Sequence, residues 1–268
     1  MKPRLAVAKF ASCDGCQLQL LNAEDELLIL TNVVDLAYFP EARRRQLPGP
    51  YDIALVEGSI TTPADAERLQ RLRAETRVLV TIGACATAGG VQALRNWADV
   101  EEYKRAVYPH PDWISSLATS TPIAAHVTVD YELWGCPVDK DQLLAVLRAL
   151  LSGTVPGLPT HSVCMTCKQR GLTCVVVARD APCLGPVTRT GCGAICPAMG
   201  RGCYGCFGPS DQPNLPAFTA LLAAQGLTPD EARRRLRGIN GWAPAFRRAG
   251  DALATAEEAE QAEQEKPT

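Results

Sequence analysis

Short apolar runs alternate with longer amphipathic stretches along the first half of the chain. The runs at residues 4–10, 33–39, 53–56, 77–82 and 127–129 are rich in Val, Ile, Leu and Ala, so we expect a strand at each. Between them lie stretches whose apolar residues recur with a helical period. Strands that alternate with helices form parallel sheets wrapped by helices, so the pattern predicts an α/β domain.

Three of the connecting stretches carry helix signals. Regularly spaced leucines predict one helix over residues 17–30. Thr62 and Pro63 have the residue types of an N-cap and a first helical position, which predicts the start of a second helix. Residues 139–151 form an amphipathic pattern that predicts a third. The small residues 83–90 predict instead a turn that lets the backbone pack against something bulky.

By composition the chain divides into three segments. Residues 1–151 hold the predicted α/β domain, and residues 152–210 begin with a Gly- and Pro-rich linker and contain most of the cysteines. This second segment has few apolar residues, so we expect its order to come from inorganic cores rather than from hydrophobic burial. Residues 211–268 predict two helices, the second opening with a capping box at Thr228–Glu231. The acidic tail from Asp251 predicts a frayed or loose helix.

Charge and hydropathy exclude some classes of partner and place the chain in a compartment. The formal net charge is −2 and no basic, aromatic-studded segment occurs, so we expect no nucleic acid partner. No apolar run approaches the roughly 18 residues of a membrane span, and no secretion signal precedes the first strand, so we expect a cytoplasmic protein without a membrane partner. Thiols stay reduced in the cytoplasm, so the twelve cysteines are expected to be ligands rather than disulfides.

Four of the cysteines follow predicted strands. Cys13 and Cys16 follow the first, Cys85 the fourth and Cys136 the fifth, and Glu57 follows the third. The carboxyl ends of parallel strands lie on one edge of a sheet, where ligands bind. We therefore expect these four thiols to converge there, although long stretches of sequence separate them.

The other eight cysteines lie close together in sequence. They are Cys164, Cys167, Cys174, Cys183, Cys192, Cys196, Cys203 and Cys206. Four thiolates are the ligand set of one 4Fe–4S cluster, so twelve cysteines predict three clusters. Cys136 and Cys196 are each followed by proline, as is the last cysteine of the bacterial ferredoxin motif. Glycines also neighbour many of the cysteines, which suits backbone N–H groups that point at sulfides.

Zinc and dithiol chemistry are the alternatives. The pairs Cys164/Cys167 and Cys203/Cys206 have the spacing of zinc half-sites, which would make this a zinc-stabilised interaction module without redox activity. The Cys13-x-x-Cys16 motif alone also fits a redox dithiol. One zinc site would leave four of the eight clustered cysteines without a role, so the whole set favours iron–sulfur clusters.

Four segments resemble the small subunit of nickel–iron hydrogenases. They are Phe10–Leu20 (FASCDGCQLQL), Val56–Ile60 (VEGSI), Thr81–Gly90 (TIGACATAGG) and Gly135–Pro137 (GCP). The resemblance runs from about residue 4 to residue 209. Within this family the chain is most similar to the delta subunit of the cytoplasmic NADP-linked hydrogenases, also called sulfhydrogenases.

The resemblance implies a fold, an activity and partners. It implies a flavodoxin-like, doubly wound parallel sheet followed by an irregular iron–sulfur segment with few regular elements. The chain would relay electrons between a nickel–iron large subunit and a flavin subunit that handles NADP(H), with a further iron–sulfur subunit in the complex and sulfur or polysulfide as an additional acceptor. It would hold no nickel, flavin or nucleotide, would not activate H2 alone and would have no catalytic residue; a G-x-G-x-x-G motif is absent.

The resemblance also assigns ligands. It implies Cys13, Cys16, Cys85 and Cys136 at a proximal cluster, Cys164, Cys167, Cys174 and Cys183 at a distal cluster, and Cys192, Cys196, Cys203 and Cys206 at a medial cluster, each 4Fe–4S. The CLGPVT stretch matches the family segment that joins the distal set to the medial set. Glu57 would support the edge of the proximal cluster or a partner contact, against the alternative of an ordinary loop carboxylate.

The chain departs from the periplasmic members of the family. Those members use the histidine of an H-x-x-C motif as a distal ligand; His161 occupies such a motif here, but four cysteines already fill the distal site, so His161 is expected beside the cluster or at the surface. Cys196 supplies a fourth medial thiolate. Leu18 replaces their glutamate, so the proton route differs in detail. The related cluster subunit of quinone-reducing complexes is a weaker match, because its family places two cysteines side by side where Asp14 and Gly15 intervene here.

Overall fold

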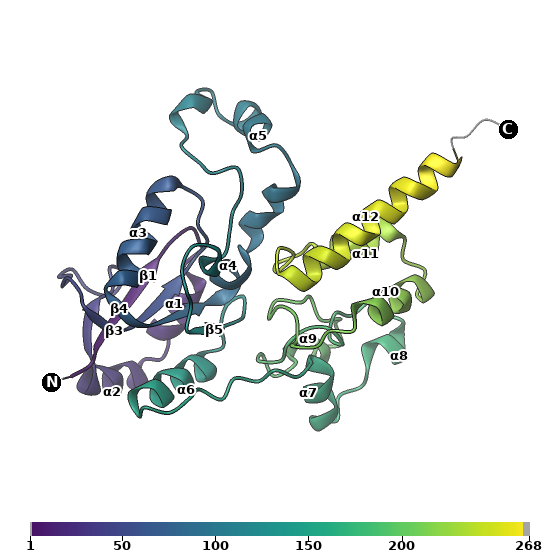
Figure 1. Cartoon of the computed structure of the whole chain (residues 1–268). Coiled ribbons are helices and arrows are strands. Elements are labelled where there is room, and N and C mark those ends of the chain that lie inside the picture. Colours follow the sequence, from purple (N-terminus) through teal and green to yellow (C-terminus); the bar gives the residue numbers. More distant parts are fainter. Residues whose placement is uncertain (1, 265–268) are drawn as a thin grey trace. The chain divides into compact units, whose positions relative to one another are not determined.

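The chain folds as two compact units. The computed structural model describes residues 2–264, with side chains to residue 255. One unit extends to Leu158 and the other begins at Pro159, so the cysteine-rich segment and the C-terminal helices belong to the same unit (Figure 1). Within residues 2–264, no helix has both the length and the apolar character needed to cross a membrane.

The first unit is built on a five-stranded parallel sheet. The strands are β1 (Arg4–Lys9), β2 (Asp35–Tyr38), β3 (Tyr51–Glu57), β4 (Thr76–Ile82) and β5 (Tyr131–Leu133), in the spatial order β2-β1-β3-β4-β5. This is the flavodoxin-like order, and its switch point lies between β1 and β3. The predicted α/β fold class is confirmed.

Helices cover both faces of the sheet. The first unit contains α1 (Gly15–Leu21), α2 (Asp25–Val33), α3 (Pro63–Ala74), α4 (Gly83–Ala88), α5 (Val100–Val107) and α6 (Lys140–Leu151), with short 3-10 helices η1 (Val91–Trp97), η2 (Pro111–Trp113) and η3 (Ile123–Ala125). The predicted N-cap is confirmed, because the Thr62 side chain accepts a hydrogen bond from Asp65 N. Asp139 caps α6 in the same way.

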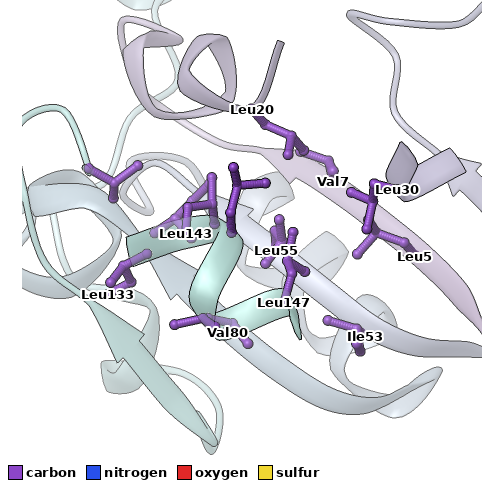
Figure 2. Packing of buried hydrophobic residues seen from close by; sticks show 14 of the residues in the cluster. Leu5, Val7, Leu20, Leu30, Ile53, Leu55, Val80, Leu133, Leu143 and Leu147 are labelled. Atoms are coloured by element: carbon purple, nitrogen blue, oxygen red, sulfur yellow. The ribbon is translucent and has the colours of Figure 1, made fainter. Parts of the chain in front are cut away.

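Alternating side chains of the strands form two cores. Leu5 lies opposite Ile53 and Val7 opposite Leu55, and Leu55 lies opposite Val80 on the next strand. These side chains face α1, α2 and α6 and form one continuous core (Figure 2). The intervening residues, such as Ala6, Ala54 and Leu79, face the opposite core. The sheet is therefore buried on both faces, which fixes its register and the positions of its strand ends.

Leu55→Ala is expected to lower the free energy of unfolding by about 2–5 kcal/mol. Leu55 is fully buried between two strands, so removing its side chain leaves a cavity in the core. Chemical denaturation of the purified protein measures the change. The matched control is Leu28→Ala on α2, where the side chain is 65% exposed and the expected change stays within about 0.5 kcal/mol. Equal losses for the two variants would contradict this assignment of the core.

The structure corrects three local expectations. The single helix over residues 17–30 is two helices, α1 and α2, separated at Glu24, whose φ is +44°. The break lets leucines of both helices reach the same core. No strand forms at residues 127–129; β5 begins at Tyr131, because the Asp130 side chain takes the hydrogen bond of Leu79 N at 2.7 Å. The small residues after β4 form the helix α4 rather than a turn, which suits their high alanine content.

The second unit consists of short helices and loops. Its helices are α7 (Val163–Gln169), α8 (Val175–Arg179), α9 (Ile195–Ala198), α10 (Leu215–Ala224), α11 (Pro229–Leu236) and α12 (Pro244–Gln264). Three helices follow the cysteine-rich segment, and the third, α12, runs into the tail for which a frayed or loose helix is predicted. The capping box at Thr228 is confirmed. The acidic tail is helical as far as Gln264, and residues 265–268 of the predicted tail lie outside the described residues.

A hydrophobic core joins the cysteine-rich segment to these helices. Leu184 and Val187 pack with Phe218, Leu222 and Phe246, all nearly fully buried. The expectation that inorganic cores alone order this segment is therefore wrong. The C-terminal helices supply the apolar surface that the segment itself lacks.

Candidate metal centres

Four thiols meet at the carboxyl edge of the sheet. Cys13 and Cys16 lie where β1 leads into α1, Cys85 lies in α4 directly after β4, and Cys136 follows β5. The charge of Cys85 and Cys136 raises the pKa of Cys16, and the charge of Cys13 raises the pKa of Cys85 and of Cys136. The four cysteines that the sequence predicts at one edge are thus electrostatic neighbours.

Burial makes these thiols weak acids in the absence of a metal. Desolvation is the largest cause of the raised pKa of Cys16, and it raises the pKa of Cys85 to about 11 and also raises that of Cys136. Metal binding requires thiolates, so loading this site releases protons. A cation in the site would stabilise the charges that burial now disfavours.

Glycines bring the backbone against these sulfurs. Gly83 has a φ of +88°, and a Cβ there would overlap Cys16 Sγ. Gly90 has a φ of +64°, and its Cβ would lie 2.6 Å from Cys85 Sγ. Side chains are thus excluded on two sides of the site, which fits a bulky inorganic group held by backbone and thiols.

Glu57 lies at the same edge, at the end of β3. Its side chain is 1% exposed, and its two carboxylate oxygens accept hydrogen bonds from Cys16 N at 3.2 Å and Gln17 N at 3.0 Å. Burial raises the pKa of Glu57, and the two N–H donors oppose that rise. The carboxylate therefore fixes the turn that carries Cys16 and is not an ordinary loop residue.

Sequence reasoning missed two further contacts at this edge. Gln92 donates from Nε2 to the Ala11 carbonyl at 2.7 Å, and its Oε1 lies 3.5 Å from Cys85 Sγ. Lys9 forms an ion pair with Asp14 between the two cysteines of the first motif, with 2.6 Å between Nζ and Oδ1. The charged pair could have been inferred from its position on either side of Cys13, but no signal in the sequence marked Gln92.

In the second unit, Cys183 lies among the other thiols. It is buried, and its sulfur accepts hydrogen bonds from Cys203 N at 3.1 Å and Gly185 N at 3.4 Å. A Cβ on Gly185 would lie 3.2 Å from Cys183 Sγ and 3.6 Å from Cys164 Sγ. Backbone again lies against the sulfurs, as it does in the first unit.

The thiols of the second unit form two overlapping neighbourhoods. Burial is the largest cause that raises the pKa of Cys164 to about 11, and the charges of Cys183, Cys167 and Cys174 contribute to the same rise. Burial and the charges of Cys183 and Cys206 raise the pKa of Cys203 to about 12. Cys196 has Cys192 and Cys183 as neighbours. Cys183 adjoins both groups, so the division into distal and medial ligands remains a prediction.

Cations surround the second set of thiols. Lys168 lowers the pKa of Cys164, Arg170 lowers that of Cys167 and Arg201 lowers that of Cys196, each against a larger effect of burial. The Arg170 guanidinium also donates to the Gly193 carbonyl, which ties α7 to the loop of Cys192. Residues 159–210 contain the basic residues Lys168, Arg170, Arg179, Arg189 and Arg201 and one acidic residue, Asp180.

His161→Ala is expected to leave the iron content of the chain unchanged. His161 is exposed, and its backbone carbonyl, rather than its ring, is held by a hydrogen bond from Thr190 N at 2.9 Å. Iron analysis of the purified variant measures the outcome, with Cys164→Ser as the matched change in the same motif. Loss of iron from the His161 variant would show that His161 is a ligand, and it would contradict the assignment of four cysteines to the distal cluster.

Among the side chains that the structure describes, no three from His, Cys, Asp and Glu are arranged to hold a single metal ion. Both sets instead have thiols spread around glycine backbone, with N–H donors directed at sulfur in the second unit. This donor set fits the ligands of an iron–sulfur cluster.

Comparison with known proteins finds one matching family and three related chains. A family model for the NADH ubiquinone oxidoreductase, 20 Kd subunit matches residues 13–150. Sulfhydrogenase 2 subunit delta of Pyrococcus furiosus is 36% identical over 239 residues, covering 89% of this chain and 100% of that protein. The NAD-reducing hydrogenase HoxS subunit delta of Cupriavidus necator is 31% identical over 59% of this chain and 83% of its own length. A crystal structure of an NAD+-reducing nickel–iron hydrogenase in the H2-reduced state contains a chain that is 32% identical to this one, with a TM-score of 0.55. The match covers 59% of this chain and 96% of that chain.

Proposed function

We propose that this chain relays electrons through three 4Fe–4S clusters, because it belongs to the NADH ubiquinone oxidoreductase 20 Kd subunit family. Within that family it is a small (delta) subunit of the hydrogenase type. The relay runs between a nickel–iron large subunit and a flavin subunit that exchanges electrons with NADP(H). Each cluster, when bound, takes up and releases single electrons. The hydrogenase chemistry itself belongs to the large subunit.

One observation carries the proposal most directly. Cys13, Cys16, Cys85 and Cys136 come together from three strand ends at the edge of a flavodoxin-like sheet. In such sheets this edge is where ligands bind. The four thiols would hold the proximal cluster, with the glycines beside them leaving room for its sulfides. Of the eight remaining cysteines, Cys164 to Cys183 would hold the distal cluster and Cys192 to Cys206 the medial one.

The names of the relatives support the partners. The Cupriavidus protein is a subunit of an NAD-reducing hydrogenase and the Pyrococcus protein of a sulfhydrogenase. We propose a complex with a catalytic large subunit, a flavin subunit and a further iron–sulfur subunit, with NADP(H) as the electron carrier and sulfur as an additional acceptor. Twelve cysteines with no disulfide between them favour the cytoplasm.

A quinone-reducing complex is the second candidate. The family model that matches residues 13–150 is named for the 20 Kd subunit of NADH ubiquinone oxidoreductase, which favours this class. The Asp14-Gly15 pair between the first two cysteines, and the match to the whole length of a sulfhydrogenase delta subunit, favour the hydrogenase. Quinone-dependent oxidation of NADH by the purified complex, without H2 activity, would select the second candidate.

Iron, sulfide and zinc analysis tests the relay. The chain, purified anaerobically from its native complex, is expected to contain about twelve iron atoms and about twelve acid-labile sulfides. Its brown colour should bleach with dithionite. About eight iron atoms would mean that one ligand set is wrong. A colourless protein that holds zinc and no sulfide would contradict the proposal in favour of a zinc-stabilised module.

A further inference from the structure

The two sets of thiols have opposite electrostatic surroundings. In the first unit, the Glu57 carboxylate is 1% exposed and is held beside Cys16 by hydrogen bonds from Cys16 N and Gln17 N. In the second unit, the charged side chains that act on Cys164, Cys167 and Cys196, apart from other cysteines, are Lys168, Arg170 and Arg201. Net charge and hydrogen bonds to sulfur are among the factors that set the reduction potential of an iron–sulfur cluster.

From this contrast we infer that Glu57 gives the first unit's cluster the lowest reduction potential of the three, and so biases electron flow from that cluster toward the second unit. The inference rests on the proposed function, because it requires a 4Fe–4S cluster in each set of thiols. It assigns to Glu57 the role of a positioning residue that acts on the cluster through charge.

Glu57 is suited to this role by its burial and by its contacts. The carboxylate is held by Cys16 N and Gln17 N, so its charge stays beside the thiols. Lys9 is a cation that acts on Glu57, but Asp14 engages it in an ion pair, so it compensates the charge of Glu57 little. Adding an electron to a cluster beside a buried negative charge is unfavourable, and this lowers the potential.

The second unit has cations where the first has Glu57, and it has three N–H donors to sulfur, whereas in the first unit the Val138 N–H acts on Cys16. The Cys183 sulfur accepts hydrogen bonds from Cys203 N and Gly185 N, and the Cys203 sulfur accepts one from Gly205 N at 3.5 Å. N–H donors and cations stabilise the extra negative charge of a reduced cluster, so both raise the potential.

Burial decides which of these charges matters most. Lys168 and Arg201 are exposed, so solvent and salt screen them. Glu57 is 1% exposed, so its charge acts through a medium of lower polarity. The difference in potential between the units should therefore depend mainly on Glu57.

Three variants in the purified complex test this role. Glu57→Gln keeps the shape and removes the charge, Glu57→Asp keeps the charge on a shorter side chain, and Lys168→Gln removes an exposed cation of the second unit. The readout is a potentiometric titration of the reduced clusters followed by electron paramagnetic resonance. Glu57→Gln should raise one of three midpoint potentials by about 59 mV or more, equal to a tenfold change in the ratio of reduced to oxidised cluster.

The remaining variants separate charge from structure. Glu57→Asp should stay close to wild type, and Lys168→Gln should lower a different midpoint by less than the glutamate change. The inference is overturned if Glu57→Gln leaves all midpoints unchanged, or if Gln and Asp shift the same midpoint equally, as a purely structural role requires. A wild-type chain with fewer than three four-iron clusters would instead refute the proposed function, and iron analysis of the same sample reveals that case.

Discussion

Cys16→Ser is expected to remove about four iron atoms from the chain and to leave about eight in place. Cys16 is the most buried of the four thiols at the sheet edge, at 7% exposure. The other three cysteines at this edge are already assigned as ligands, so none of them can replace it. A serine hydroxyl stays protonated and is a poor ligand for iron. The second unit is a compact body with its own core, so its sites should load independently.

Cys16→Ser should also interrupt electron transfer through the chain. Mutation of residues that hydrogen-bond to metal ligands typically lowers metal affinity or activity by about 10–100-fold. Loss of a ligand itself should therefore lower H2-dependent reduction of NADP by at least about 100-fold. The measurement compares H2-dependent NADP reduction with dithionite reduction of the remaining clusters. Leu18→Ala is the matched control, because Leu18 lies in the same helix with its side chain 46% exposed. Full iron content or near-normal turnover in the Cys16 variant would contradict the assignment of the proximal ligands.

Gly83→Ala is expected to prevent loading of the same site without changing any ligand. Gly83 has a φ of +88°, and the new methyl group would occupy the space of Cys16 Sγ. Because Glu57 fixes the backbone of Cys16, the sulfur can avoid the methyl group only by rotating about its Cα–Cβ bond, which takes it out of the position from which it would bind iron. We expect about four iron atoms to be lost, as for Cys16→Ser.

Gly153→Ala is the control for backbone strain. Gly153 lies in the same unit with a φ of +69°, but nothing lies within 4 Å of a Cβ there. Its alanine variant should lose only about 1–2 kcal/mol of stability from the left-handed conformation and should retain its iron. The comparison therefore isolates the contact with sulfur. If both variants lose iron, strain alone accounts for the loss; if neither does, the glycine does not shape the site.

The sequence predicted the sheet and the edge of the site because both follow from local patterns. Buried parallel strands appear as apolar runs, and a residue that directly follows such a run must lie at the carboxyl edge. Cys13, Cys85 and Cys136 could be placed in this way. Glu57 could be placed at the edge too, but its hydrogen bonds to Cys16 N and Gln17 N depend on the pairing of β1 with β3, which no local pattern reveals.

Other features depend on tertiary contacts and were missed for that reason. The leucine spacing continues through Glu24, where neither glycine nor proline signals the break between α1 and α2. Asp130 displaces the start of β5 by bonding to Leu79 N, a contact between distant residues. The cysteine-rich segment obtains its core from Phe218 and Phe246, which lie beyond it in sequence.

H2-driven reduction of this chain's clusters tests the relay most directly. The intact complex is purified anaerobically through a tag on this chain, exposed to H2 without NADP, and frozen for electron paramagnetic resonance. The account predicts that the nickel–iron subunit copurifies and that all three clusters become reduced, and that NADP then reoxidises them as NADPH forms. Clusters that dithionite reduces but H2 does not, in a complex that still consumes H2, would contradict the claim that this chain carries the electrons.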